Sequence, residues 1–152
     1  MARRGLLLPK RLKHFFPFVH KALLFEKNQG NYTVGSNVRD SACYVVWAFA
    51  RAYNPEILKP FVVELARTLL TVCIYDREIH CRRAAAAAFQ EHVGRQGHFS
   101  HGIEILTEAD YFTLGVRNNA YLNVGIFVAS YTEYFENFVN HLIDIKLKHP
   151  DF

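Results

Sequence analysis

A short pattern recurs three times along the chain and restricts it to a repetitive helical architecture. Arg-x-x-Ala, with a large apolar residue four positions after the alanine, begins at Arg39, Arg82 and Arg117, so successive copies are 43 and 35 residues apart. Each copy opens a stretch in which apolar residues recur with helical spacing. Two helices in about 40 residues is the period of HEAT and armadillo arrays, whose helix pairs stack to bury their apolar faces. The pattern therefore predicts an all-α protein, an α-solenoid of HEAT/armadillo-like repeats.

Apolar spacing and turn residues also place the individual helices. Five successive alanines at 84–88 make their segment the most strongly helical one. We expect helices over about 12–23, 36–53, 55–73 and 78–94, an apolar turn at 103–106, and helical segments from Thr107 or Asp110 to 129 and from Ser130 or Thr132 to 145. The polar stretch 26–36 is expected to be a loop. No strand pair is expected. A strand at 121–131 stays an alternative, because β-branched and aromatic residues are frequent there.

The composition fits one ordinary globular unit of 152 residues, 51% apolar and 21% charged. We predict a single α-solenoid fragment of about three helix pairs, at approximately 1–54, 55–97 and 98–152. No run approaches the ~20 apolar residues that a membrane span needs, so no span is expected. Cys43, Cys73 and Cys81 cannot all pair with one another, and their helical, apolar contexts fit a reducing compartment.

The arginines at the helix starts have a structural and a partner-binding interpretation. Asp76 lies six residues before Arg82, the spacing at which HEAT repeats place an Asp-to-Arg bridge between a turn and the next repeat. The structural interpretation assigns four positions to contacts between repeats: Arg39, Asp76, Arg82 and Arg117. In the partner-binding interpretation, Arg83 and Arg95 face an acidic protein. This interpretation suits Arg95 better, because Arg95 follows Gly94, where the helix is expected to end.

Basic residues are concentrated at the amino end of the chain. Residues 1–27 hold seven Lys or Arg against Glu26 alone, whereas the other 125 residues hold 11 basic and 13 acidic ones. Nucleic-acid binding usually needs a basic stripe along the whole domain, so no nucleic-acid partner is expected. A basic end that meets an acidic protein surface fits better, with Lys10, Arg11 and Lys13 as candidate contacts.

Few residues suggest catalysis or metal binding. There is no glycine-rich phosphate loop, no G-x-S-x-G, no H-E-x-x-H and no Cys-x-x-Cys, so no catalytic residue and no cofactor is expected. His80 and Cys81 with Cys73 supply too few ligands, at a spacing that matches no common zinc site. His98 and His101 lie on a polar loop, where solvated histidines are the more common explanation. A catalytic hypothesis is that Cys81 acts as a nucleophile whose thiol pKa is lowered by the adjacent arginines. Against this hypothesis, nothing in the sequence positions an oxyanion hole.

The aromatic residues, 13 Phe and 8 Tyr, are mainly expected to fill the core at helical spacing. Partner anchors are expected among a small group: Phe99, Tyr111, Tyr121, Tyr131, Tyr134 and Phe152.

Longer stretches of the sequence resemble one protein family. They are RRGLLLP (3–9), VGSNVRDSACYVVWAFARAY (34–53), LKPFVVELA (58–66), YDREIHCRRAAAAAFQEHVGRQG (75–97) and HGIEILTEADYF (101–112). Together they resemble the tubulin-specific chaperone D family, also called tubulin-folding cofactor D, in register over essentially the whole chain. The resemblance is to an internal section of a much longer HEAT/armadillo protein, so the chain is expected to be a fragment or a truncated product.

The resemblance implies a function that composition and spacing do not. It implies a cytosolic, microtubule-associated chaperone that captures β-tubulin, works with the other tubulin-folding cofactors in assembling and dismantling the αβ heterodimer, and binds an Arf-like small GTPase. It also implies a part in stimulating GTP hydrolysis by tubulin, with no catalytic site of its own. The alternative hypothesis is a structural spacer, or protein–protein scaffold, that makes no direct contact with tubulin.

Overall fold

The computed structural model describes residues 4–30 and 32–148, which are predominantly helical. The elements in chain order are η2 (Pro9–Arg11), α1 (Leu12–Leu23), β1 (Lys27–Gln29), β2 (Tyr32–Val34), α2 (Ser36–Ala52), α3 (Pro55–Leu58), η3 (Lys59–Phe61), α4 (Val62–Tyr75), α5 (Ile79–Gln96), α6 (Gly102–Glu108), α7 (Arg117–Asn119), η4 (Ala120–Val124), α8 (Gly125–Ala129) and α9 (Thr132–Lys148). The prediction of an all-α solenoid is confirmed. No helix in the described ranges is long and apolar enough to cross a membrane.

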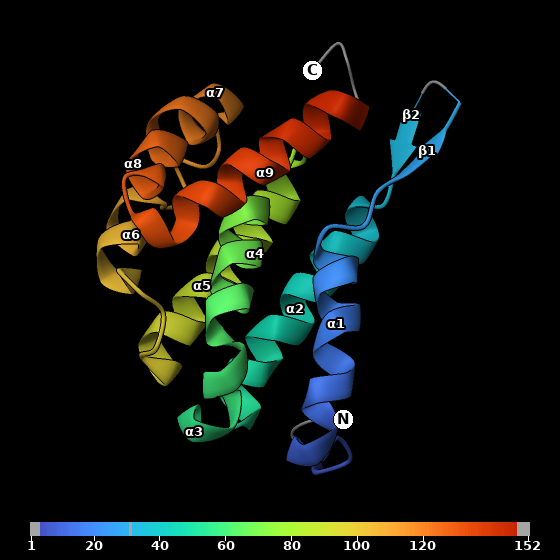
Figure 1. The fold of residues 1–152 in the computed structure, drawn as a ribbon, viewed down its shortest axis with the longest axis vertical. Coiled ribbons are helices and arrows are strands. Elements are labelled where there is room, and N and C mark those ends of the chain that lie inside the picture. Colours follow the sequence, from blue (N-terminus) through green and yellow to red (C-terminus); the bar gives the residue numbers. More distant parts are fainter. Residues whose placement is uncertain (1–3, 31, 149–152) are drawn as a thin grey trace.

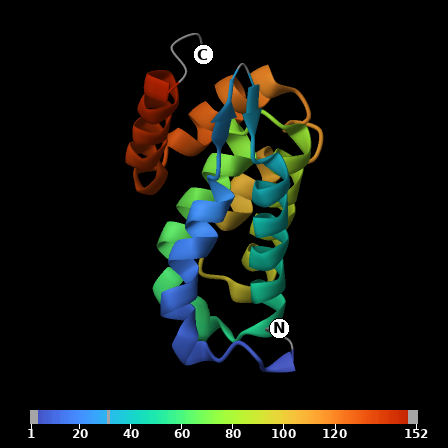
Figure 2. The same cartoon turned by 90° about the vertical axis from the view of Figure 1, so that its right-hand side faces the viewer.

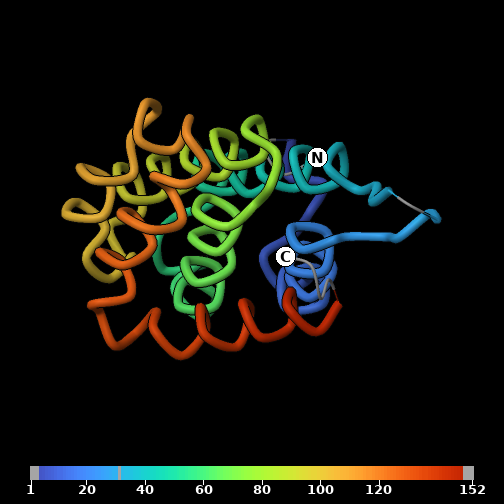
Figure 3. Tube along the Cα trace, turned by 90° about the horizontal axis from the view of Figure 1, so that it is seen from above, coloured from blue at the N-terminus to red at the C-terminus, as the bar shows by residue number. Residues whose placement is uncertain are grey.

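The helices stack in pairs (Figure 1). Seen from above, α1 and α4 form one layer and α2 and α5 form a second, while α9 crosses the outer side of α4 (Figure 3). The first two expected repeats thus each contain one helix pair, and 98–152 contains α6, the helical run α7–η4–α8, and α9. The division at 54 and 97 stays a prediction.

Helix α4 lies at the centre of the fold. It contacts α1, α5, η4 and α9, and its residues Leu65, Leu69, Leu70 and Ile74 are all fully buried. From Thr68 to Tyr75 every residue of α4 is buried, and a helix segment that is buried all round needs neighbours on all sides, which explains this position. Four of the five alanines of α5 pack in or against the same core, because small side chains let α5 approach α2 and α4 closely; Ala85 has no exposed surface, and only Ala87 of the five faces solvent.

Two polar side chains of α5 join this helix to the backbone of α2. A ring nitrogen of His92, Nε2, lies 2.9 Å from the carbonyl oxygen of Val46. The amide of Gln96 donates to the carbonyl oxygens of Ala50 and Tyr53, at 2.8 and 2.9 Å. Ala50 lies in the last turn of α2 and Tyr53 caps it, so Gln96 satisfies carbonyls that the end of a helix leaves open, whereas His92 contacts a carbonyl farther inside the helix. Sequence periodicity did not indicate them.

The stretch expected to be a loop contains a β-hairpin, so the prediction of no strand pair is wrong there. Strands β1 and β2 are antiparallel, with Lys27 opposite Val34 and Gln29 opposite Tyr32. The hairpin stands beyond the ends of α1 and α2 (Figure 2). Its physical basis is local: Gly30 adopts φ +61°, which favours glycine, and Tyr-Thr-Val suits an extended strand.

The chain after α6 also differs from its prediction. Residues 103–106 belong to a helix, and the next helix begins at Arg117 instead of at Thr107 or Asp110. The cause is the Asp110 carboxylate, which accepts the backbone N–H groups of Phe112 and Thr113 at 2.8 and 2.7 Å and so stabilises a turn. No strand forms at 121–131: residues 121–129 are helical and belong to the π-helix η4 and to α8, and Ser130 and Tyr131 form the turn before α9.

Candidate partner-binding surface

Arg39 and Asp76 form a buried two-point ion pair between successive helix pairs. Arg39, in the first turn of α2, donates from Nε to Oδ2 of Asp76 at 2.6 Å and from Nη2 to Oδ1 at 3.1 Å. The carboxylate also accepts the backbone N–H of Glu78 at 2.9 Å, and Arg39 donates to the Phe25 carbonyl at 2.9 Å. Burial alone would lower the pKa of Arg39, but the hydrogen bond and charge of Asp76 raise it. The pair therefore links the start of α2 to the turn between α4 and α5.

Arg82 has a different set of partners from the one expected. The predicted bridge to the Asp76 carboxylate is wrong: Arg82 reaches the main-chain oxygen of Asp76 at 2.9 Å, because Arg39 occupies the carboxylate. The buried guanidinium also donates to the carbonyls of Arg77, Leu114 and Gly115 at 3.1, 2.8 and 3.2 Å. Arg82 thus connects the turn before α5 to the loop before α7 through backbone acceptors alone.

Arg117, the third copy of the pattern, is exposed at the start of α7. It makes no ion pair with any residue in 4–30 or 32–148. Its assignment to an inter-repeat contact stays a prediction.

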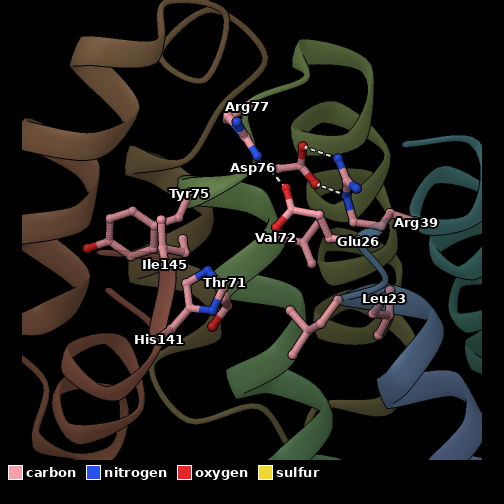
Figure 4. A pocket seen from close by; sticks show the side chains of 11 residues that line it. Leu23, Glu26, Arg39, Thr71, Val72, Tyr75, Asp76, Arg77, His141 and Ile145 are labelled. Atoms are coloured by element: carbon pink, nitrogen blue, oxygen red, sulfur yellow. Dashed lines mark hydrogen bonds and ion pairs between the residues drawn. The ribbon is translucent and has the colours of Figure 1, made fainter. Parts of the chain in front are cut away.

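The Arg39–Asp76 pair borders a small pocket where α9 meets α1 and α4. The pocket encloses about 60 Å³, and its lining includes Leu23, Val72, His141 and Ile145. The Arg39–Asp76 pair and the Glu26–Arg77 pair lie together at its charged end (Figure 4). Burial lowers the pKa of His141, so this side chain favours its neutral form. Because the charged groups are paired with each other, the pocket offers little unpaired charge to a ligand.

The five partner-binding candidates differ in their solvent exposure and in whether their charge is already paired within the chain. Lys10, Arg11 and Lys13 are all exposed where η2 leads into α1. Arg95 is exposed at the end of α5, but it is paired with Glu91, which also accepts from Arg51 at 3.1 Å. The charge of Arg95 is therefore already matched within the chain. The three residues at the amino end offer a more available cationic surface.

Arg83, the fifth candidate, is half-buried and lies over the ring of Tyr111, with 3.6 Å between its guanidinium carbon and the ring centroid. Tyr111 is exposed, as expected for a partner anchor, whereas Phe99 and Tyr134 are buried and Phe152 lies outside the described residues. Sequence reasoning missed Phe112, which is 80% exposed. Its position next to an Asp-initiated turn was the available signal.

The cysteines, and the histidines within residues 4–30 and 32–148, show no arrangement suited to catalysis or metal binding. The Cys81 thiol is fully buried and donates to the carbonyl of Ser36 at 3.3 Å. Burial, followed by the charge of Asp76, raises its pKa to about 12, so the expectation that neighbouring arginines lower it is wrong. Within the part of the chain that the structure describes, no three His, Cys, Asp or Glu side chains are grouped as metal ligands. His101 instead stacks on Tyr131, with ring centroids 3.9 Å apart.

Comparison with known proteins identifies the family of this helical protein. A family model described as "Tubulin-specific chaperone D-like, ARM repeats" matches residues 1–103. The chain belongs to the tubulin-specific chaperone D family. It is 48% identical to the tubulin-specific chaperone D of Dictyostelium discoideum over 99% of this chain and 10% of that relative. It is 28% identical to the tubulin-folding cofactor D of Schizosaccharomyces pombe over 99% of this chain and 14% of that relative. No solved structure matches the chain.

The predicted resemblance to the chaperone D family is thereby confirmed. The residues that match the armadillo-repeat model include all elements from η2 to α5. The chain spans only 10% and 14% of the length of the two relatives named above. Their names are those of a chaperone and a folding cofactor, not of an enzyme class.

Proposed function

We propose that this chain is a segment of a cytoplasmic, microtubule-associated chaperone that binds β-tubulin while the αβ heterodimer is assembled and dismantled. The observation that carries the proposal is the match of residues 1–103 to the armadillo repeats of tubulin-specific chaperone D. Other tubulin-folding cofactors and an Arf-like small GTPase are its further partners. The chain has no catalytic site of its own: tubulin hydrolyses the GTP, and the chaperone supports that activation.

The amino-terminal basic face supports a direct contact with tubulin. Lys10, Arg11 and Lys13 are exposed and make no ion pair with any described residue. Phe18, which is 67% exposed on the same helix as Lys13, adds apolar surface. Tubulin is an acidic protein, so complementary charge would speed and orient the encounter, and salt would weaken it. We call Lys10, Arg11 and Lys13 the basic face.

The spacer function remains the second candidate because of the contacts between helix pairs. Arg39 with Asp76, and Arg82 with the carbonyls of Leu114 and Gly115, connect elements that are more than 30 residues apart in sequence. Such contacts set the relative orientation of successive helix pairs, which is the role of a spacer. In that case tubulin binds other parts of the chaperone.

Sedimentation of the purified chain with αβ-tubulin, at low and physiological salt, separates the two functions. The test variant replaces Lys10, Arg11 and Lys13 by Gln. The matched control replaces three exposed lysines on other elements, Lys27, Lys59 and Lys148, by Gln, so the net charge falls equally. Circular dichroism on the same samples verifies that each is helical.

A tubulin-binding segment requires that the wild-type chain co-sediments less at higher salt, and that the basic-face variant loses most of its binding while the control keeps it. If the wild-type chain is helical but does not co-sediment with tubulin, the proposal is rejected and the spacer function is favoured. Equal loss in both triple variants would show that net charge, and not the basic face, governs the association.

A further inference from the structure

The loop between α6 and α7 holds its backbone in a heavily hydrogen-bonded conformation. Asp110 accepts two backbone N–H groups of the loop through its carboxylate. Its own N–H donates to the hydroxyl of Thr113 at 3.0 Å, and that hydroxyl lies 2.7 Å from the Glu108 carbonyl, to which it donates. Asn119 donates to the carbonyl of Thr113 at 2.9 Å. The turn is thus closed by its own side chains.

The same loop is also anchored to the core. Leu114 is fully buried, and the buried guanidinium of Arg82 donates to the carbonyls of Leu114 and Gly115. A loop tied down at this many points loses little conformational freedom when it binds, which lowers the entropic cost of binding.

This anchored loop nevertheless presents its largest side chains to solvent. Tyr111 is 59% exposed and Phe112 is 80% exposed, more than any other large apolar residue in the described ranges. The two rings are perpendicular, with centroids 5.6 Å apart. Exposed aromatic side chains held in a fixed conformation are typical of the residues that dominate protein–protein binding energy.

A cation lies beside the two rings. The guanidinium of Arg83 is stacked on Tyr111, and a side chain at Gly115 would approach its Nη2 within 3.2 Å, so the glycine leaves room for this position. Arg83 makes no ion pair with the described residues, and its Nε is buried without a hydrogen-bond partner. A guanidinium whose plane is fixed by stacking is suited to two-point binding of a carboxylate.

The surrounding charges indicate what kind of partner fits. Glu108 and Asp110, which flank the rings in sequence, are both exposed. Two carboxylates next to the rings in sequence would repel a polyanion such as a nucleic acid or an anionic membrane. A protein segment with a single carboxylate next to an apolar side chain meets much less repulsion, since its one carboxylate binds Arg83 and the apolar group covers Phe112.

We propose that Arg83, Tyr111 and Phe112 form a second contact with tubulin, which takes a protein segment that carries a single carboxylate beside an apolar side chain. This inference rests on the proposed function and adds to it a contact that is predominantly apolar. We call these three residues the aromatic clamp. The aromatic clamp should lose less affinity than the basic face as salt is raised, since burial of apolar surface at Phe112 is not screened and only the contact of Arg83 with the carboxylate is.

The test measures the dissociation constant of the 152-residue chain for αβ-tubulin at physiological salt. Phe112→Ser removes an exposed ring without touching the core and is expected to raise the dissociation constant roughly tenfold. Arg83→Gln is expected to raise it several-fold, and Arg83→Lys to recover only part, because an ammonium group lacks the planar fork. The matched control is Leu147→Ser, which removes a residue 75% exposed at the far end of α9.

Each outcome bears on one claim. Loss of affinity in the Phe112 and Arg83 variants, with the Leu147 variant within twofold of wild type and all variants equally helical, supports the aromatic clamp. Unchanged affinity in Phe112→Ser overturns the clamp and leaves the proposed function standing. An equal loss in Leu147→Ser also overturns it, because any exposed apolar residue would then count. A wild-type chain that does not bind tubulin overturns the proposed function and the clamp with it.

Discussion

Arg39 holds the carboxylate of Asp76 at two points, 37 residues away in sequence, through hydrogen bonds of 2.6 and 3.1 Å. The side chains are only 12% and 4% exposed, so the pair is largely withdrawn from water. Arg82, which occupies the same place in the next copy of the pattern, binds carbonyl oxygens instead. The repeated arginines therefore share a position but not an acceptor.

Removing Arg39 should destabilise the fold strongly. Arg39→Ala leaves the buried carboxylate of Asp76 without its cation, and we expect the free energy of unfolding to fall by about 3 kcal/mol. Urea unfolding followed by circular dichroism measures the change. Arg117→Ala is the control, because this arginine begins the third copy of the pattern but is exposed, and its effect should stay within about 0.5 kcal/mol. Equal effects of the two substitutions would contradict a structural role for the Arg39–Asp76 pair.

Removing Arg82 should also be costly, for a different reason. Arg82→Ala leaves four carbonyl oxygens, two of them in the loop before α7, without their donor, and should lower the unfolding free energy by about 3 kcal/mol. Arg82→Lys should recover only part, since one ammonium group cannot reach all four acceptors. Thermal unfolding tests both variants. A melting midpoint that does not move in Arg82→Ala would refute the connection.

The stability of the chain should fall at mildly acidic pH because of His92. Burial lowers the pKa of His92 to about 4, although its hydrogen bond to the Val46 carbonyl partly opposes this. The unfolded chain, with a histidine pKa near 6.5, binds more protons between these values, so the unfolding free energy falls as the pH falls. For this one group the loss from pH 7 to pH 4 is about 3 kcal/mol.

The matching measurement is urea unfolding across that pH range for wild type, His92→Gln and His80→Gln. The slope against pH should be shallower in His92→Gln, whatever its absolute stability, and unchanged for the exposed His80. Some slope should remain, since burial also lowers the pKa values of His20 and His141. A slope in His92→Gln equal to that of wild type would exclude His92 as its source.

The cysteines should be inert in the folded chain. All three thiols are buried, and burial raises the pKa values of Cys73 and Cys81 to about 12 and that of Cys43 in the same direction. Thiolate, the form that reacts, is therefore scarce at neutral pH. Iodoacetamide followed by mass spectrometry should show alkylation only after urea is added. Rapid labelling of Cys81 in the native chain would reopen the hypothesis of a cysteine nucleophile, as would loss of any activity in Cys81→Ala.

Helices were predictable where the signal was local. The alanine run before Phe89 and the glycine at 97 act through the backbone of their own segment, so periodicity and turn chemistry were sufficient for α5. The single helix expected over 55–73 is instead divided into α3, η3 and α4, with Pro60 in η3. The hairpin after α1 and the late start of α7 escaped prediction. In both places a few residues decide the backbone, Gly30 in the hairpin and Asp110 in the turn, and a window of apolar spacing averages over them.

The family, the helical class and the concentration of basic residues at the amino end were all determined by the sequence alone, because each depends on which residues occur and at what spacing. Only the tertiary structure decided the acceptors of Arg39 and Arg82, the burial of Cys81 and the exposure of Phe112. These depend on segments that are distant along the chain and meet when the helices stack. Since a side chain's partners and solvent exposure are set by that packing, the same Arg-x-x-Ala pattern leads to an ion pair at Arg39 and to a set of carbonyl contacts at Arg82.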